Sequence, residues 1–374
     1  MTPLQGLKLL DLSRQLPGPF CSTFLGDLGM DVLVVASPSD PFGMGIPFLG
    51  RNKRSMTLNL KTAEGREILL RLADEADVLL EGFRPGVAAR LGLGYATLAA
   101  RNPRLIYCAI SGYGQDGPYR DRVGHDVNYL GTAGVLDSIG TADGPPVIPG
   151  VQIADIGGGA LMAVIGILAA VIARQQTGRG QLVDIAMLDG AAMWTVYPLL
   201  LHQLGQDPRR GRTQLTGSHP CYAVYETRDG RYLTIGAYEP HFWATLCRAL
   251  GLERYLEQQW SEGPLRVTMQ AEFRAAFRAR TLAEWMHALG NQDICVGAVN
   301  SVEDMLADPQ LRHRGMVTTG PDGQTTLGNP IKLSDTPASL RTPPPVFGQD
   351  TDTVLAGLGL DAAAIERLRS SGAV

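Results

Sequence analysis

The spacing of apolar residues in the first half of the chain alternates between a strand pattern and a helix pattern. Short apolar runs predict buried strands, whereas apolar residues that recur every three or four positions predict helices. This alternation is typical of a parallel, doubly wound sheet with crossover helices, so we expect an α/β fold. The expected strands are residues 7–12, 31–35, 78–83, 105–110 and 181–186, and the expected helices are residues 18–29, 61–73 and 160–173.

Two of these segments carry further predictions. Residues 160–173 are apolar on every side of a helix, which predicts a helix buried all round. Ligands of parallel sheets bind beyond the carboxyl ends of the strands. The turn at residues 111–114 directly follows an expected strand, so we expect this turn and the residues after it at the functional edge.

The pattern changes after residue 220. Two runs with strand spacing flank Asp229-Gly230, and Asp-Gly between strands is a strong hairpin signal. These features predict a second, smaller α+β domain. Its expected strands are residues 222–226 and 232–236, and its expected helices are residues 240–250, 266–278 and 281–289. A short helix is expected at residues 362–369, and the apolar Val354 and Leu355 predict that the C-terminal segment docks on the body.

The composition is that of a globular enzyme with a large core. Of the 374 residues, 45% are hydrophobic and 19% are charged, and the formal net charge is −4. No global basic field exists to attract nucleic acid or an anionic membrane, so neither is an expected partner. The longest apolar run, residues 160–173, is too short to span a bilayer as a helix.

The N-terminus and the cysteines indicate a cytoplasmic location. The first residues lack the basic flank and apolar core of a signal peptide. The five cysteines are scattered and form no CxxC pair, so we expect neither a disulfide framework nor a metal site.

Two ionisable side chains, His125 and Asp155, stand at expected helix starts. Facing each other across one carbon, such groups would remove a proton from one face and return one to the other. Asp155 also fits a helix N-cap, and His125 also fits a half-buried structural histidine. Three glycines, residues 157–159, follow Asp155; glycine within a helix indicates a close approach, which we expect from a ligand or a neighbouring chain.

Two more carboxylates join these candidates. Backbone N–H groups near Asp126 would stabilise an oxyanion that develops on a substrate carbonyl. Glu239 follows the second strand of the expected hairpin. It is either a solvated loop carboxylate or a partner that orients the histidine.

Basic residues are the candidates for anion binding. Arg51, Lys53 and Arg54 form a cluster, and Arg84 and Arg90 follow further along the chain. We expect them in loops beside the sheet edge, where phosphates would bind; a solvated charged face is the alternative. No Walker loop, dinucleotide fingerprint, HExxH or Gly-x-Ser-x-Gly motif occurs in the sequence, which argues against the enzyme classes that use them.

Several segments together resemble the family III CoA-transferase superfamily, and the resemblance runs almost from end to end. The segment Gly124-His125-Asp126-Val127-Asn128-Tyr129 is similar to the α-methylacyl-CoA racemase branch of that superfamily. The other segments that carry the resemblance are residues 26–32, 59–61, 77–86, 111–118, 178–181 and 347–355.

The resemblance implies a racemase of 2-methylacyl-CoA thioesters that works through an enolate-like intermediate. His125 and Asp155 would be the acid/base pair, with Glu239 close to the histidine. Coenzyme A would be part of the substrate, with no prosthetic group, and Tyr129 would join the basic residues as a CoA contact. One departure is Ser37, which stands where the family usually carries an arginine that helps to hold the CoA nucleotide.

The resemblance also implies an interlocked homodimer, in which each large domain faces its partner's small domain. The implied divisions are a large Rossmann-like CoA-binding domain at residues 1–190 completed by 330–374, a linker at 191–219, a small α+β domain at 220–310, and a return linker and docking C-terminal segment at 311–374.

Two other functions stay open on the sequence. In a CoA-transferase, Asp155 would be the nucleophile, forming a mixed anhydride and then an enzyme-bound thioester, and only that carboxylate would be essential. A CoA-binding protein without catalysis would need neither group. The acyl group is not identified, although Met44, Ile46 and Phe48 are candidates for lining its path.

Overall fold

The computed structural model describes residues 1–39 and 47–374, which fold into two compact units. Unit 1 consists of residues 1–133, 149–194 and 309–374, and unit 2 of residues 134–148 and 195–308. Residues 134–148, expected in the large domain, belong to unit 2. The expected linker, residues 191–219, divides between unit 1 up to residue 194 and unit 2 from residue 195. Unit 1 also contains residues 309–329, which were expected in the small domain up to residue 310 and in the return linker from residue 311.

Unit 1 is built on a six-stranded, fully parallel sheet, with the strand order β3-β2-β1-β4-β5-β6. This confirms the expected doubly wound α/β fold. The strand that the apolar pattern missed is β3, because its sequence Lys-Arg-Ser-Met-Thr has no apolar run. The strands are β1 (Lys8–Asp11), β2 (Asp31–Ala36), β3 (Lys53–Thr57), β4 (Val78–Glu81), β5 (Ile106–Ser111) and β6 (Leu182–Ala186).

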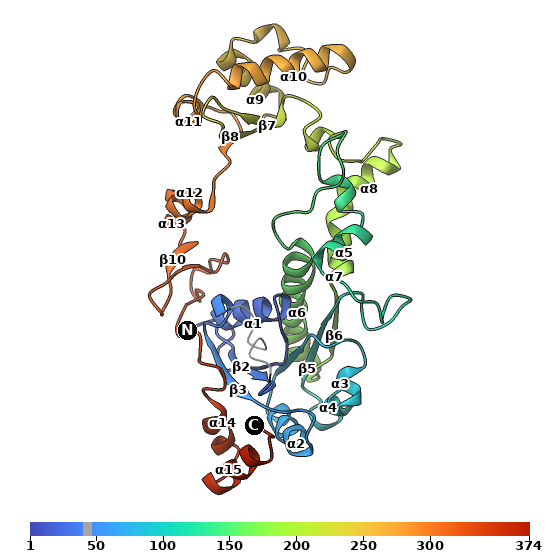
Figure 1. The fold of residues 1–374 in the computed structure, drawn as a ribbon, viewed down its shortest axis with the longest axis vertical. Coiled ribbons are helices and arrows are strands. Elements are labelled where there is room, and N and C mark those ends of the chain that lie inside the picture. Colours follow the sequence, from blue (N-terminus) through green and yellow to red (C-terminus); the bar gives the residue numbers. More distant parts are fainter. Residues whose placement is uncertain (40–46) are drawn as a thin grey trace. The chain divides into compact units, whose positions relative to one another are not determined.

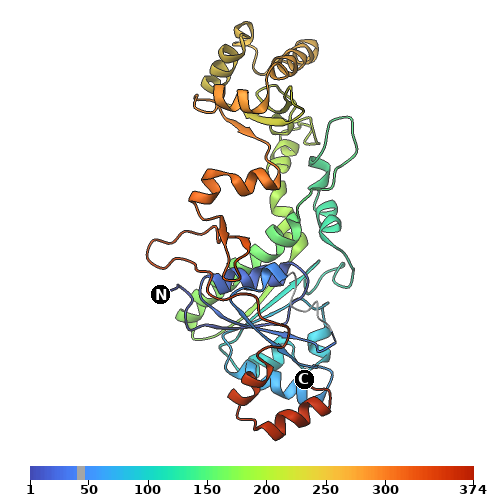
Figure 2. The same ribbon diagram turned by 60° about the vertical axis from the view of Figure 1, so that its left-hand side comes forward.

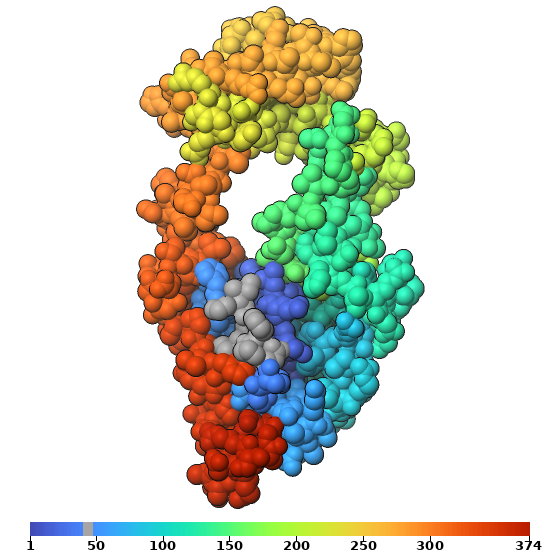
Figure 3. Space-filling model, viewed as in Figure 1, coloured from blue at the N-terminus to red at the C-terminus, as the bar shows by residue number. Residues whose placement is uncertain are grey.

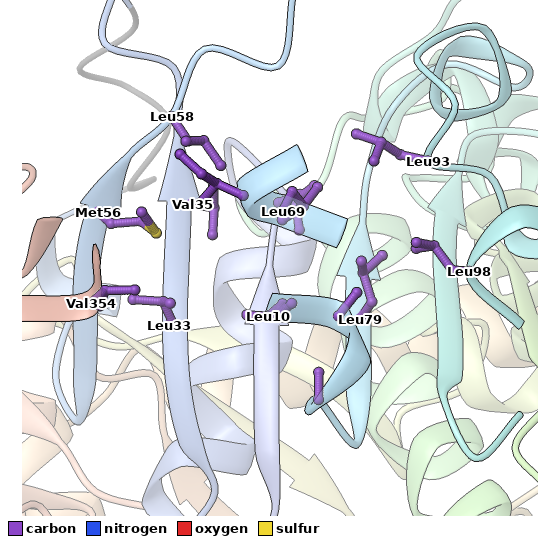
Figure 4. Close-up of a cluster of buried hydrophobic side chains, with 14 of the residues drawn as sticks. Leu10, Leu33, Val35, Met56, Leu58, Leu69, Leu79, Leu93, Leu98 and Val354 are labelled. Carbon is purple, nitrogen blue, oxygen red and sulfur yellow. The ribbon is translucent and has the colours of Figure 1, made fainter. Parts of the chain in front are cut away.

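Helices cover both faces of this sheet (Figures 1 and 2). α1 (Pro17–Asp27) and α6 (Leu161–Thr177) pack on one face, and α2 (Ala63–Asp74) packs on the other. Alternate strand residues point to that second face and form a core with α2 (Figure 4). The remaining helices of unit 1 are α3 (Val87–Arg90), α4 (Tyr95–Arg101), α5 (Asp126–Thr132), α7 (Met187–Ala192), α13 (Pro309–His313), α14 (Thr351–Gly357) and α15 (Ala362–Ser370), and β10 (Val317–Thr319) pairs with β11 (Thr325–Leu327).

The C-terminal segment docks on unit 1, as expected. Val354 and Leu355 on α14 are buried in the same core as α2, and the backbone N–H of Ser55 donates to Asp350 Oδ2 at 2.8 Å. In the space-filling view this segment, in red, lies against the first strands and helices of unit 1, in blue (Figure 3). Residues about 300 apart in sequence therefore complete one layer.

The helix that follows residue 152 is longer than expected and is not buried all round. A π-helical segment, η4 (Ile153–Ala160), runs directly into α6, giving 25 residues that are apolar enough to cross a membrane by length and composition. Half of the most apolar window is buried in the fold, and α6 packs against β5 and β6, as a core helix does. Ile165 and Ile172 are nevertheless 58% and 59% exposed. Within the single chain the prediction of burial on every side is therefore wrong, because one apolar face of α6 is left uncovered.

Unit 2 is the α+β unit that the pattern after residue 220 predicts. β7 (Tyr222–Glu226) and β8 (Tyr232–Gly236) form the expected antiparallel hairpin, and β9 (Val296–Ala298) pairs with β8. One face of this sheet packs on helices around Trp243, Phe273 and Phe277, which are fully buried. The helices are α8 (Val196–Gln203), α9 (Pro240–Leu250), α10 (Gly263–Phe277), α11 (Leu282–Leu289) and α12 (Val302–Ala307).

Candidate active site

The site in unit 1 lies beyond the end of β5, where Tyr129 of α5 packs between Gly112 and Gly124. A Cβ on Gly112 would lie 2.6 Å from Tyr129 Oη, and a Cβ on Gly124 would lie 2.8 Å from Tyr129 Cε1. Only residues without side chains leave room for the ring at these positions. The Tyr129 hydroxyl donates to the Gly124 carbonyl oxygen at 2.6 Å, so this ring fixes the loop that leads into His125.

His125 stands at the start of a helix, as expected. It is the N-cap of α5 and has an extended backbone conformation. Its backbone N–H donates to Asn128 Oδ1 at 3.0 Å. Its carbonyl oxygen accepts the N–H of Asn128 at 2.8 Å. The imidazole itself is exposed. The backbone is therefore held in place while the side chain remains available for a ligand.

Asp126 connects α5 to the segment that carries Asp155. Asp126 Oδ1 accepts a hydrogen bond from the backbone N–H of Asp155 at 2.9 Å. The side-chain charges of Asp126 and His125 both act on the Asp155 carboxyl group. The structure thus brings together three of the four predicted catalytic residues, which the sequence separates by about thirty positions.

The Asp155 carboxyl group is tuned toward neutral pH. Burial, and then the negative charge of Asp126, raise its pKa to about 6, while the nearby His125 lowers it. The side chain is half-buried, so it still meets solvent. A carboxyl group with a pKa of about 6 can donate and accept a proton near physiological pH, as a general acid/base must.

The glycines after Asp155 are explained by a helix of the same chain. A Cβ on Gly158 would lie 2.8 Å from the backbone nitrogen of Ala191 and the carbonyl oxygen of Met187, both in α7. A Cβ on Gly157 would lie 2.9 Å from Trp194 Cζ2. The close approach is therefore real, but α7 makes it, which corrects the expected ligand or neighbouring chain. The π-helical winding places Asp155 in the first turn of η4, and such winding is frequent at functional sites.

Two of the basic residues predicted to bind CoA are buried in unit 1 and bonded to other protein groups. Arg51 is buried and forms a two-pronged ion pair with Asp27, with N–O distances of 3.0 and 2.7 Å. Lys53 is buried, and its ammonium group donates to Ser22 Oγ at 2.7 Å and to the Pro19 carbonyl oxygen at 2.9 Å. Burial lowers the pKa of Lys53 to about 8.

The cluster at residues 51–54 also lies at a different edge from the one expected. Lys53 is the first residue of β3 and pairs in register with Val32, near the start of β2, so it begins at the amino edge of the sheet. The Arg54 side chain there is 43% exposed and pairs with Asp31 at 2.8 and 3.1 Å. These positions correct the expectation that this cluster occupies loops beside the functional edge.

Arg84, Arg90 and Tyr129 lie on the carboxyl side of the sheet. Arg84 and Arg90 follow β4 and are both exposed. Tyr129 is buried with its hydroxyl bonded to Gly124, so it supports the site from inside instead of presenting its ring to a ligand. Ser37, which follows β2, is exposed and lies 3.0 Å from Ser39, Oγ to Oγ.

Glu239 belongs to unit 2. It is the exposed N-cap of α9, directly before Pro240. Among the acyl-path candidates, Phe48 is 43% exposed, and Met44 and Ile46 lie outside the described residues. Within residues 1–39 and 47–374, no group of three or more His, Cys, Asp or Glu side chains is placed to hold a metal ion.

Comparison with known proteins gives this arrangement a family. Residues 4–351 match the model of CoA-transferase family III. The chain belongs to this family. It is 39% identical over 376 residues to the α-methylacyl-CoA racemase of Mus musculus, covering 98% of this chain and 96% of the relative. It is 33% identical to the succinyl-CoA:glutarate CoA-transferase of Mus musculus, covering 100% and 90%. A crystal structure of a CaiB/BaiF family protein from Brucella suis superposes with a TM-score of 0.83 at 34% identity, covering 96% and 99%.

This family III chain is therefore an enzyme of CoA thioesters, and its relatives divide between racemases and CoA-transferases. Two residues that the sequence did not single out lie beside Arg84 and Arg90. Glu81 ends β4, and it is buried and accepts the backbone N–H of Phe83 at 2.6 Å. Arg120 approaches the Arg84-Pro85-Gly86 turn from the loop after β5. Arg120 has no local sequence signal, because it reaches this turn from a segment distant in sequence.

Proposed function

We propose that this family III enzyme racemises 2-methylacyl-CoA, or a related 2-substituted acyl-CoA, by 1,1-proton transfer. One member of the pair His125 and Asp155 removes the α-proton, and the other returns a proton to the opposite face of an enolate-like intermediate. The observation that supports this most is the pair itself. An exposed imidazole acts electrostatically on a half-buried carboxyl group whose pKa is about 6.

The difficult step is ionisation of a weakly acidic α-carbon. General acid/base positioning contributes on the order of 10²–10⁴-fold in rate. Stabilisation of the thioester oxygen as it becomes an oxyanion contributes a comparable factor for each donor, roughly 3–4 kcal/mol, so two donors together contribute more. Backbone N–H groups at the start of α5, near Asp126, are the donors in this proposal, since they adjoin both catalytic side chains.

The supporting roles follow from the same geometry. Asp126 positions the backbone of Asp155 and raises the pKa of its carboxyl group. Glu239 orients the His125 imidazole in the assembled enzyme. Arg84 and Arg90 hold phosphates of CoA, whereas Arg51 and Lys53 are left out of the CoA site because their charges are satisfied internally. The enzyme acts in the cytoplasm.

A homodimer is part of the proposal. The exposed apolar face of α6, with Ile165 and Ile172, has the character of a surface that another chain covers. A second copy is the partner that the family resemblance implies. Glu239 then reaches the histidine from the small unit of the assembled, interlocked dimer.

CoA transfer between carboxylic acids is the second candidate function. A half-buried carboxylate that still meets solvent also suits a nucleophile, and relatives of both kinds cover nearly the whole chain. The two reactions differ in what they require. Transfer needs the Asp155 carboxylate alone, whereas racemisation needs His125 as well.

Deuterium incorporation separates the two functions. One epimer of a 2-methylacyl-CoA is incubated with the enzyme in D2O, without an acceptor acid. A racemase yields the other epimer carrying one deuterium at the α-carbon. No incorporation above a heat-denatured control, together with CoA transfer to an added carboxylic acid, would establish the transferase instead.

A further inference from the structure

Two arginine side chains reach one glycine on the carboxyl side of the sheet. Gly86 has a φ of +82°, and a Cβ there would lie 3.1 Å from a terminal nitrogen of Arg120 and 3.3 Å from a terminal nitrogen of Arg90. Both nitrogens therefore lie within contact distance of the same point at the Gly86 Cβ position. Arg84, two residues before Gly86, is exposed on the same turn.

Two guanidinium groups that reach the same point repel each other unless an anion lies between them. The carboxylate near Arg120 does not fill that role, because Asp121 pairs with its other terminal nitrogen at 3.0 Å and is 81% exposed. An exposed pair of this kind contributes little to holding a side chain. The net charge of the protein is −4, so this basic group is a local feature and not part of a general field.

Arg120 is anchored through one of its nitrogens, and its side chain is 39% exposed. Its Nε donates to the Gln115 carbonyl oxygen at 2.9 Å. The terminal nitrogen next to Gly86 points at the turn that carries Arg84. This arrangement orients the planar fork before any ligand arrives, and such a fork suits two-pronged binding of phosphate oxygens.

The turn beneath the arginines is fixed by a buried carboxylate. Glu81 Oε2 accepts the backbone N–H of Phe83 at 2.6 Å, and Tyr107 donates to Glu81 Oε1 at 3.4 Å. A Cβ on Gly82 would lie 3.7 Å from Ser13 Cβ, so the turn also meets the loop after β1. That position, between β1 and β4, is the switch point of the sheet order, where doubly wound folds bind ligands.

We infer that Arg120 and Arg90 clamp one phosphate group of the CoA moiety over Gly86. The inference rests on the proposed function in that it takes CoA as the ligand. It assigns to Arg120 a binding role that its sequence context does not indicate. Gly86 is required because any side chain there would occupy the space between the two guanidinium groups.

Calorimetric titration of CoA and of dephospho-CoA, which lacks the 3′-phosphate, tests the clamp without relying on turnover. Arg120→Ala should weaken CoA binding by roughly ten-fold or more, as loss of a charged hydrogen bond does, and Arg120→Lys should weaken it less. Arg122→Ala is the matched control, because that guanidinium lies 3.6 Å over the Tyr119 ring. It should leave CoA affinity unchanged. Melting temperatures of the variants confirm that each is folded.

The titrations also identify which phosphate is held. If Arg120→Ala removes the preference of the wild type for CoA over dephospho-CoA, the clamp holds the 3′-phosphate; if both ligands weaken equally, it holds the diphosphate. A folded Arg120→Ala that binds CoA as tightly as Arg122→Ala overturns the clamp while leaving the proposed function intact. Failure of the wild type to bind CoA at all would overturn both.

Discussion

The carboxylate of Asp126 accepts a hydrogen bond from the backbone N–H of Asp155, at 2.9 Å. Burial raises the pKa of the Asp155 carboxyl group, and the Asp126 charge raises it further, so Asp126 acts on both the position and the proton affinity of Asp155. His125 is adjacent to Asp126 in sequence, so this bond also joins the two backbone segments that carry the proposed acid/base pair.

Replacing Asp126 with Asn should separate these two effects. The Asn oxygen can still accept the Asp155 N–H, but the negative charge is gone, so the pKa of Asp155 should fall. We expect the acidic limb of the kcat/KM profile to move to lower pH by roughly half a pH unit or more. Asp126→Ala should in addition lower the melting temperature, since the bond is lost. An unmoved limb in Asp126→Asn would show that the charge does not act on Asp155.

The shape of the pH profile should distinguish the two candidate reactions. A racemase needs one proton shared by His125 and Asp155, so kcat/KM falls both when the pair is fully protonated and when it is fully deprotonated. With the Asp155 pKa at about 6, the acidic limb should lie near pH 6. The profile should be the same in both directions of epimerisation. A rise through pH 6 to a plateau with no alkaline limb would favour the transferase.

Glu81 should make the stability of the fold depend on pH. Burial raises the pKa of this carboxyl group from 4.5 to about 7, although hydrogen bonds from Phe83 and Tyr107 lower it in part. Between these pH values the folded state binds more protons than the unfolded state, so stability falls as pH rises. Relative to Glu81→Gln, the wild type should lose on the order of 2–3 kcal/mol between pH 5 and pH 8.

Urea unfolding of the two proteins at pH 5 and pH 8 measures this difference. Asp155 also has a raised pKa and contributes in the same direction, but it does so equally in both proteins. Equal pH dependence in the wild type and Glu81→Gln would mean that Glu81 is not the group responsible.

Gly158 should be intolerant of even a methyl group. A Cβ there would lie 2.8 Å from backbone atoms of α7, which cannot move as a flexible side chain can. Gly158→Ala should destabilise unit 1 by about 1–3 kcal/mol. Gly357→Ala is the matched control, because nothing lies within 4 Å of its Cβ position at the end of α14. That change should be neutral or slightly stabilising, and equal melting temperatures for both variants would refute the packing argument.

Most of the sheet was predictable because its strands are buried on both faces and read as continuous apolar runs. The strand β3 was not predictable, because it begins with the charged residue Lys53. Only the fold shows that the ammonium group of Lys53 is buried and donates hydrogen bonds to Ser22 and Pro19. For the same reason the cluster at residues 51–54 looked like a ligand site. The sequence alone does not distinguish a basic residue that is buried in the fold from one that binds a ligand.

The candidate site was likewise predictable in part, in its local features but not in its contacts between distant segments. The helix start at His125 and the close approach at Gly157–Gly159 followed from local preferences of the backbone. What approaches the glycines, and which arginines meet at Gly86, depends on contacts between segments distant in sequence. Those contacts are set by the packing of α7 and of the loop after β5, which no local pattern encodes.

Stereochemically resolved deuterium exchange shows whether His125 and Asp155 act as two bases on opposite faces of the substrate. Each epimer of a 2-methylacyl-CoA is incubated in D2O with the wild type, His125→Ala and Asp155→Asn, and deuterium at the α-carbon is measured by mass spectrometry. The wild type should exchange and interconvert both epimers. Each variant should lose interconversion and exchange only one epimer, a different one in each, since each retains one base. No exchange by the wild type, or full interconversion by His125→Ala, would contradict a two-base racemase.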